Sequence, residues 1–191
     1  MAEPAIRFMS LAEFLRWEDG TDTCYELIGG IPTGMAPPAQ AHGMLCARLA
    51  GVIDGCLRSR RPCSVQTEAG IVPDREDTFY VADLAATCRP YQRGEQMVEE
   101  PILIVEILSP GNERHDRHTK VPAYREIDSV SEILLIDSES IYAERLRREG
   151  DRWITELVRG LDAILRLSSV DQQIVMAELY EGIDLGSENS A

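Results

Sequence analysis

The stretch PILIVEILSP, residues 101–110, decides the expected fold of this chain. Its aliphatic and β-branched side chains, stopped by Ser109-Pro110-Gly111, predict a strand that is covered on both faces of a sheet. Glu106 lies within that strand, where an ionised carboxylate must be paired, hydrogen-bonded or bound to a cation. Two interpretations follow: a structural ion pair with an arginine, or a ligand in a functional site.

A second acid lies in an apolar strand upstream, in the stretch YVADLAAT. Alternation along this strand places Phe79, Val81, Asp83 and Ala85 on one face. If the two strands are neighbours, the carboxylates of Asp83 and Glu106 come close, and both stay ionised only with a cation between them. Oxygen ligands without a Cys or His cluster favour Mg²⁺ or Mn²⁺.

Lys120 follows these acids and is the only lysine in the chain, since every other basic residue is an arginine. A lysine at a helix start is often simply solvated. A compact, titratable ammonium can also orient or deprotonate a water molecule. Two acids and a nearby lysine are the groups that metal-assisted hydrolysis of a phosphodiester requires.

Composition indicates one globular domain, residues 1–191, with a core of about residues 10–185 and a frayed C-terminal tail. Neither a signal peptide nor a membrane-spanning segment is evident, which predicts a cytoplasmic protein without membrane association. The net charge of −14 opposes general attraction to nucleic acid. The odd number of cysteines, without zinc spacing, predicts reduced thiols at Cys24, Cys46, Cys56, Cys63 and Cys88.

Hydrophobic periodicity predicts an alternation of helices and strands along the chain. Ser10 and Glu13 form a capping-box pattern at the start of the first helix. Pro122 is tolerable only in the first turn of its helix, and Asp171 or Ser169 is the expected cap of the last one. The expected helices are 10–18, 39–58, 120–127 and one within 164–180; the expected strands are 24–28, 31–35, 63–72, 79–86, 102–108, 132–137, 140–147, 153–158 and one within 164–180.

The segments YELIGG, PPAQAH, VADLAAT and PILIVEILSPGNERHDRHTKVPAYREI, with a hairpin ending near GLDAILRLSS, resemble the Uma family of putative restriction endonucleases. That family belongs to the PD-(D/E)XK nuclease superfamily. The resemblance implies an α/β (α+β) fold: a restriction-endonuclease-like mixed β-sheet flanked by helices, with a C-terminal antiparallel hairpin or meander. It also implies hydrolysis of DNA with Mg²⁺ or Mn²⁺.

The resemblance assigns roles to particular residues. Asp83 stands for the metal-binding aspartate, and Glu106 stands for the second metal-binding acid of the motif. The usual superfamily lysine would fall on Leu108, so the short motif is broken, and Lys120 matches the place of a lysine moved to the next helix. Glu26 matches a family glutamate that contributes to the site through a water; an ion pair with an arginine is its alternative.

Further residues follow from the same resemblance and from charge. His42 matches a family position at the start of the long helix, where it contacts the metal-bound water or the phosphate, or is structural. Arg114 and Arg117, with their neighbours His115 and His118, are candidates to hold the DNA backbone, or form a solvated loop. The family usually has Pro-Asp where this chain has Ala82-Asp83.

Three functions are compatible with these observations. The first is a metal-dependent DNA endonuclease that acts as a homodimer, since two symmetric sites cut both strands of a duplex. The second is a catalytically silent binding or assembly protein that keeps the nuclease fold, which the acidic charge favours. The third is a small-molecule phosphoesterase. Buried acids at a cost in stability favour an active site over a silent scaffold.

Overall fold

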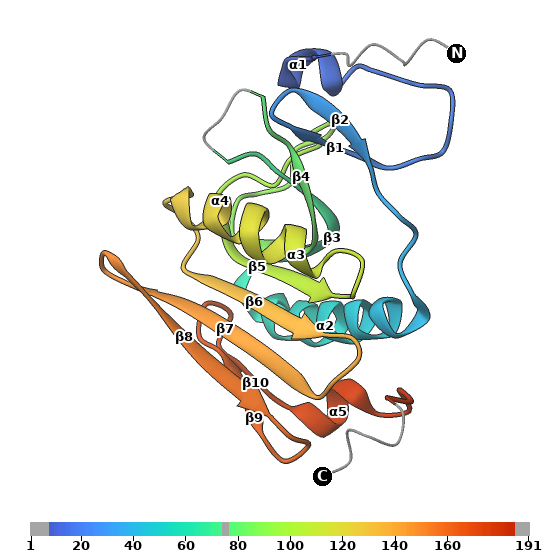
Figure 1. The fold of residues 1–191 in the computed structure, drawn as a ribbon. Coiled ribbons are helices and arrows are strands. Elements are labelled where there is room, and N and C mark those ends of the chain that lie inside the picture. Colours follow the sequence, from blue (N-terminus) through green and yellow to red (C-terminus); the bar gives the residue numbers. More distant parts are fainter. Residues whose placement is uncertain (1–7, 74–76, 186–191) are drawn as a thin grey trace.

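A six-stranded mixed β-sheet forms the centre of the computed structural model, which describes residues 8–73 and 77–185 (Figure 1). The strands lie side by side in the order β3-β4-β5-β6-β7-β8, and β5 and β6 are the parallel pair. Their bounds are β3 (Ser64–Ile71), β4 (Tyr80–Thr87), β5 (Pro101–Leu108), β6 (Glu132–Asp137), β7 (Tyr142–Glu149) and β8 (Arg152–Arg159). The sheet confirms the mixed architecture expected from the sequence.

Helices cover both faces of this sheet, which explains the continuous apolar run of β5. Helix α2 (Gln40–Leu57), followed by the short turn η1 (Arg58–Arg60), packs on one face, and α4 (Val121–Glu126) packs on the other (Figure 1). Alternate side chains of β5 enter the two layers. Leu103, Val105 and Ile107 pack in the layer of α2, whereas Ile104 and Leu108 pack in the layer of α4.

The helical connection between β5 and β6 is longer than the sequence analysis predicted. It begins with α3 (Glu113–His115), continues through a π-helical turn, η2 (Asp116–Lys120), and ends with α4. The solvated loop given as the alternative for residues 114–118 is therefore wrong, because these residues are helical. The proline ring at position 122 would collide with the carbonyl four residues earlier in a regular α-helix. A wider π turn, closed by the Val121 N–H and the Asp116 carbonyl, accommodates it.

Strand β4 changes its packing direction at Asp83. Ala82 packs in the layer of α4, whereas Leu84 packs in the layer of α2. The common face expected for the odd-numbered residues 79–85 is therefore interrupted. On the neighbouring strand, the β3–β4 pairing skips one position opposite Asp83, and Glu68 has a φ of 49° there. The local irregularity separates Asp83 from the regular alternation of its strand.

A small N-terminal unit packs against the upper end of β4 (Figure 1). It consists of α1 (Leu11–Phe14) and the hairpin of β1 (Tyr25–Ile28) and β2 (Ile31–Gly34). The predicted capping box is confirmed, because Ser10 and Glu13 exchange hydrogen bonds at the start of α1. Leu27 and Phe79 form two reciprocal backbone hydrogen bonds of 2.8 Å, which fix the hairpin to the sheet.

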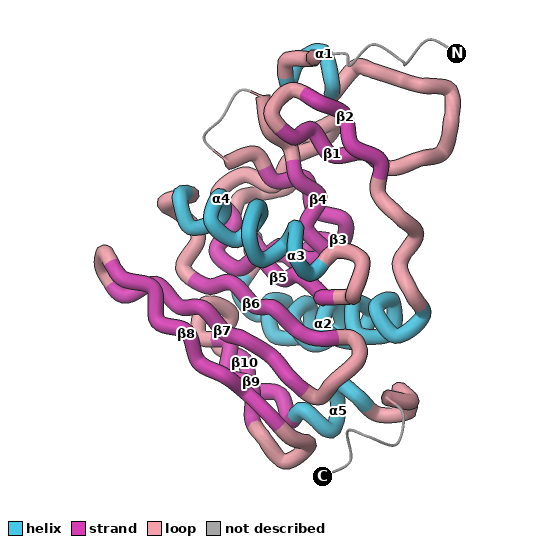
Figure 2. Tube along the Cα trace, viewed as in Figure 1, coloured by secondary structure: helices cyan, strands magenta, loops and turns pink. Residues whose placement is uncertain are grey.

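The C-terminal segment forms a second hairpin and a short helix: β9 (Ile164–Leu167), β10 (Gln172–Val175) and α5 (Met176–Tyr180). The C-terminal antiparallel hairpin is confirmed, but residues 164–180 contain two strands where one was expected, and the predicted caps are wrong. Asp171 lies between the two strands with a φ of 56°, and Val175 stands at the N-cap of α5 without a side-chain hydrogen bond. Figure 2 shows the strands of this hairpin behind β7 and β8.

Two of the cysteines are oxidised, which corrects the prediction of reduced thiols. Cys63 and Cys88 form a disulfide, while Cys24, Cys46 and Cys56 are free. The bridged residues directly flank the Ser64–Thr87 pair of the β3–β4 ladder. Antiparallel pairing therefore brings together two cysteines that are 25 residues apart in sequence.

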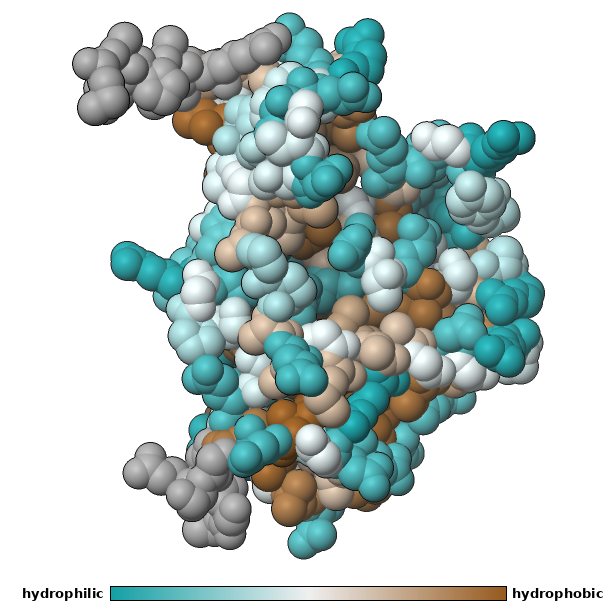
Figure 3. Space-filling model, turned by 90° about the vertical axis from the view of Figure 1, so that its right-hand side faces the viewer, coloured by the Kyte–Doolittle hydropathy of each residue, from teal (hydrophilic) through white to brown (hydrophobic). Residues whose placement is uncertain are grey.

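Within the described ranges, no helix combines the length and the apolar character needed to cross a membrane. The face shown in Figure 3 mixes hydrophilic and hydrophobic side chains in small patches. The frayed tail predicted after residue 185 lies outside the described residues.

Candidate active site

The two strand acids meet where the pairing of β4 and β5 ends. Leu84 and Val105 form the last regular pair, and Asp83 and Glu106 stand at the next position. Side chains replace the ladder there: the Ile107 N–H donates to Asp83 Oδ2 at 2.6 Å, and the Asp83 N–H donates to Glu106 Oε2 at 3.4 Å. Where the two strands diverge, each carboxylate therefore accepts a hydrogen bond from the backbone of the other strand, which brings the two acids close together.

Lys120 reaches the same point from the helical connection. Its ammonium lies 2.9 Å from Glu26 Oε1 and 3.4 Å from both Glu106 Oε1 and Asp116 Oδ1. It also donates to the Val81 carbonyl at 2.9 Å. The lysine side chain is only 5% exposed, so the solvated alternative is excluded. One ammonium is surrounded by three carboxylates.

Glu26 joins this cluster from β1 of the N-terminal hairpin. Its Oε1 accepts from the Val81 N–H at 2.9 Å, and its Oε2 lies 3.1 Å from His115 Nε2. Burial opposes ionisation, but the hydrogen bond with His115 and the charge of Lys120 hold its pKa below the ordinary value. The partners of Glu26 are therefore a lysine and a histidine, in place of the arginine of the alternative interpretation.

Glu106 is the most confined acid of the cluster, with 1% of its surface exposed. Its Oε1 accepts from the hydroxyl of Tyr124 at 2.6 Å. Burial raises its pKa to about 8; Lys120 acts against this rise, and the charges of Asp83 and Asp116 add to it. The site therefore holds more negative charge than its single lysine balances.

Burial raises the pKa of Lys120's other partner, Asp116, to about 6, with a further rise from the charge of Asp83. Lys120 itself shows the opposite balance. Burial favours its neutral form, but the charges of Glu106, Glu26 and Asp116 raise its pKa above the ordinary value. Lys120 is therefore a permanent cation at neutral pH.

His42 approaches Asp83 from the first turn of α2. Its Nε2 lies 3.1 Å from Asp83 Oδ1, so both oxygens of this carboxylate have protein partners. His42 Nδ1 is buried and has no hydrogen-bond partner within the described residues. The imidazole of His42 thus orients Asp83 through Nε2, while Nδ1 has no hydrogen-bond partner within the described residues.

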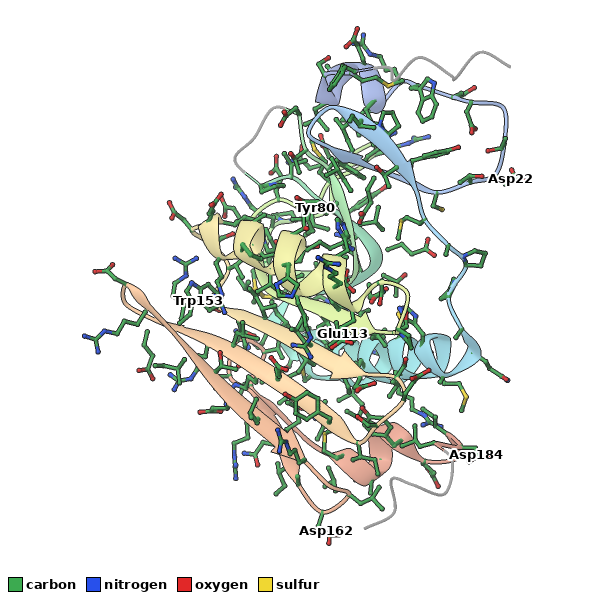
Figure 4. The ribbon with its side chains drawn as sticks, viewed as in Figure 1. Asp22, Tyr80, Glu113, Trp153, Asp162 and Asp184 are labelled. Carbon is green, nitrogen blue, oxygen red and sulfur yellow. A yellow bond between two sulfur atoms is a disulfide. The ribbon has the colours of Figure 1, made fainter. Side chains whose placement is uncertain are left out.

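Sequence reasoning missed two residues of the cluster, Asp116 and Tyr124. Both lie on the helical connection at four-residue spacing from Lys120, which is the signal that could have identified them. The ring of Tyr80 packs edge-on against Tyr124 and His115, and Figure 4 shows Tyr80 on β4 close to this connection. Aromatic packing therefore supports the two residues that bind Glu106 and Glu26.

The candidate DNA-binding arginines lie on the outer side of the connection. Arg114 is exposed. The guanidinium of Arg117 lies 2.8 Å from Glu113 and 2.7 Å from Glu144. Glu113, the first residue of α3, is labelled in Figure 4. Arg114 is thus accessible to a ligand, whereas Arg117 is already held by two acids.

The two strand acids do not form a complete metal cage by themselves. Among the residues that the structure describes, no group of three or more His, Cys, Asp or Glu side chains is arranged to hold a metal ion. Asp83 and Glu106 offer hard oxygen atoms, and each carboxylate oxygen can accept more than one bond. Mg²⁺ commonly takes one or two protein carboxylates and keeps several waters, so the donor set fits this ion.

The fold places the protein in a known structural class. A putative nuclease of the DUF820 group from Anabaena variabilis has the same fold, with a TM-score of 0.74. The match covers 90% of this chain and 97% of the other, at 19% sequence identity. The match shows that this chain has the fold of that putative nuclease.

Sequence comparison identifies the family within this class. Residues 11–177 match the model of the Uma2 family, described as putative restriction endonuclease, and the chain belongs to this family. Two proteins of Synechocystis sp. are similar over most of their length. Uncharacterized protein slr1290 is 25% identical, and the match covers 92% of this chain and 93% of the relative. Uncharacterized protein sll1609 is also 25% identical, and the match covers 88% of this chain and 97% of the relative.

Proposed function

We propose that this protein is a metal-dependent endonuclease that hydrolyses phosphodiester bonds of DNA. The observation that carries the proposal is the meeting of Asp83 and Glu106 where β4 and β5 separate, with the ammonium of Lys120 at 3.4 Å from Glu106. The nuclease-like fold and the Uma2 family support this choice of reaction.

In this proposal, Asp83 and Glu106 hold Mg²⁺ or Mn²⁺. Burial raises the pKa of Glu106, and the negative charges of Asp83 and Asp116 add to this rise; a cation at this position would offset their repulsion, which supports the proposal. A bound Mg²⁺ would offset charge on the phosphate and lower the pKa of a water molecule. The two carboxylate oxygens of Glu106 have different neighbours. Oε1 contacts the Tyr124 hydroxyl and the Lys120 ammonium, and Oε2 accepts from the Asp83 N–H. Oε2 is therefore the oxygen we assign to the cation.

Lys120 acts in the proposal as a hydrogen-bond donor and a fixed positive charge. Its raised pKa opposes a role as a general base. The ammonium orients the attacking water or a phosphate oxygen, and Glu26 keeps it in place. His42 orients Asp83 through Nε2, which leaves Asp83 Oδ1 and Oδ2 fixed relative to the strand.

The DNA backbone is bound, in this proposal, along the outer side of the helical connection. Arg114 is free to contact a phosphate from its exposed position. Arg117 would contribute only by exchanging Glu113 or Glu144 for the phosphate. Such limited basic surface on a chain of net charge −14 favours weak, salt-sensitive binding of DNA. A homodimer would add a second set of contacts.

Cleavage of supercoiled plasmid DNA with Mg²⁺ or Mn²⁺ tests this function. We expect nicked or linear products that disappear with chelator and in Asp83→Asn, Glu106→Gln and Lys120→Met. Asp54→Asn is the matched control, because Asp54 lies on the solvent side of α2 and pairs with Arg58. Activity that survives in the site variants would reject the assignment.

The same proteins separate the alternative functions. A catalytically silent scaffold cleaves neither DNA nor a chromogenic phosphodiester and shows no Mn²⁺ binding that depends on Glu106. A small-molecule phosphoesterase hydrolyses the chromogenic ester, in a manner that depends on Glu106, and leaves plasmid DNA intact.

A further inference from the structure

Asp116 is a buried acid whose carboxylate lacks the hydrogen bonds that buried carboxylates usually have. Its relative exposure is 0%, and neither carboxylate oxygen has a hydrogen-bond partner within the described residues. The ammonium of Lys120, 3.4 Å from Oδ1, is its counter-charge. A buried carboxylate without hydrogen bonds destabilises a fold, so packing alone gives no reason to keep it.

The backbone that carries Asp116 is also unusual. The π turn runs from Asp116 to Lys120 and is closed by the bond between the Val121 N–H and the Asp116 carbonyl. Both ends of this turn point into the protein and are buried, while Arg117 and His118 between them are partly or fully exposed. Single π turns are rare and occur frequently at functional sites.

Asp116 is not needed to satisfy the lysine. An ammonium has three N–H donors, and Glu26, Val81 and Glu106 already provide three acceptors from the strands. Asp116 is a fourth partner, held as an ion pair at 3.4 Å, and the only one of these four that belongs to the lysine's own helical segment. Its charge therefore acts on the ammonium from a different side than the three partners on the strands.

We propose that Asp116 is a positioning residue of this site, which fixes the direction of the Lys120 ammonium and is kept at a cost in stability. The proposal rests on the nuclease function proposed above for the same site. Within the described residues, Lys120 is the ion-pair partner of Asp116, and Asp116 is not assigned to the metal or to the DNA. Its charge restrains Lys120 from the helix side, and Glu26 and Val81 restrain it from the sheet.

The single lysine of the chain permits a direct test in the metal-free protein. Protein grown with ¹⁵Nζ-lysine gives one side-chain ammonium signal, which reports the surroundings of Lys120 without any assay of activity. In Asp116→Asn we expect this signal to shift and its protons to exchange faster with water. We also expect the melting temperature to stay equal or rise, because an unsatisfied buried charge is removed.

Asp128→Asn is the matched control, since Asp128 is exposed beyond α4 and loses the same charge. An unchanged lysine signal in Asp116→Asn overturns the proposal. A variant that melts at lower temperature, or that fails to fold, also overturns it, because Asp116 would then be structural. Asp116→Ser repeats the test with a side chain that cannot replace the amide contacts.

Cleavage kinetics provide the functional measurement. We expect kcat of Asp116→Asn to fall by up to about 10²-fold, the effect of a misplaced catalytic group, while Mn²⁺ affinity stays unchanged. Loss of Mn²⁺ affinity would make Asp116 a metal ligand and overturn the positioning role. A wild-type protein without nuclease activity would reject the proposed function, whereas the lysine signal would still decide whether Asp116 holds Lys120.

Discussion

Two buried ion clusters in the same sheet differ in how completely their charges are satisfied. In the first, Glu132 of β6 accepts from Arg145 Nε at 2.5 Å and from the backbone of Ser168 and Ser169, and also from the Ser169 hydroxyl at 2.6 Å. One buried acid faces one guanidinium, which also pairs with the exposed acid Glu156 at 2.8 Å, and the loop of the C-terminal hairpin fills the remaining lone pairs of Glu132. We call this the Glu132 cluster.

The Lys120 cluster, formed by Lys120, Glu26, Glu106 and Asp116, has the opposite balance. Three carboxylates share one ammonium, and Asp116 lacks hydrogen bonds within the described residues. Burial and neighbouring negative charge raise the pKa of Glu106 to about 8. The comparison teaches that a cluster with balanced charges and filled hydrogen bonds serves the stability of the fold, whereas the Lys120 cluster keeps unbalanced negative charge, which the proposed cation would offset.

The largest expected effect separates the two clusters by stability. Glu132→Ala leaves the buried guanidinium of Arg145 without its main partner and removes the hydrogen bonds to the hairpin loop, so we expect a loss of about 3–5 kcal/mol in unfolding free energy. Urea denaturation followed by circular dichroism measures it. Glu106→Gln serves as the comparison and should lose little stability, because the negative charge of Glu106 is not balanced by a cation of its own. Equal losses in both variants would remove the distinction.

The pH dependence of stability offers the next test. Glu106 has a raised pKa in the folded protein, near 8 against an ordinary value of 4.5, so the folded state binds the proton more tightly than the unfolded state. Its contribution is therefore present below about pH 4.5 and is lost as pH rises through 8, at up to about 1.4 kcal/mol per pH unit. Denaturation of metal-free protein between pH 5 and 8 should show this decline. In Glu106→Gln the decline should flatten, and an identical profile would contradict the assignment.

A smaller effect is expected from the hydroxyl that orients Glu106. Tyr124→Phe removes the 2.6 Å hydrogen bond to Glu106 Oε1, and we expect Mn²⁺ affinity to fall by about 10-fold or more. Isothermal titration calorimetry measures this change. Tyr142→Phe is the matched control, because it removes a 2.6 Å hydrogen bond to Glu144, outside the site. Similar affinities in the two variants would show that Tyr124 only packs.

The smallest expected effect belongs to the Glu132 cluster. Ser169→Ala deletes a single hydroxyl contact with Glu132 and should cost about 1.5 kcal/mol in unfolding free energy, the lower end for a hydrogen bond to a charged group. Plasmid cleavage should be unchanged. A loss of cleavage with unchanged stability would link this cluster to the reaction and weaken the comparison.

Much of the site was visible in the sequence because its acids violate an apolar pattern. Glu106 and Asp83 stand out within strands of aliphatic residues, and Lys120 stands out as the only lysine. Asp116 could not be recognised in the same way, because it lies among charged residues in GNERHDRHTK. In such a segment the sequence does not show which acid is buried. The π turn that buries it depends on Pro122 and on packing against the sheet.

The fold shows the same division. Strands with strong periodicity, such as β5 and β6, were predicted within one or two residues. The Cys63–Cys88 disulfide was missed because pairing across 25 residues depends on the strand register. The interruption of β4 at Asp83 was missed for the same reason, since it arises from the ladders on both sides of the strand.

The central claim is that Asp83 and Glu106, beside Lys120, bind a divalent cation. Calorimetric titration of Mn²⁺ into the metal-free protein tests this claim most directly. The account predicts saturable binding to the wild-type protein that is lost in Glu106→Gln and retained in Ser169→Ala. Absence of binding to the folded wild-type protein, or undiminished binding to Glu106→Gln, would contradict it.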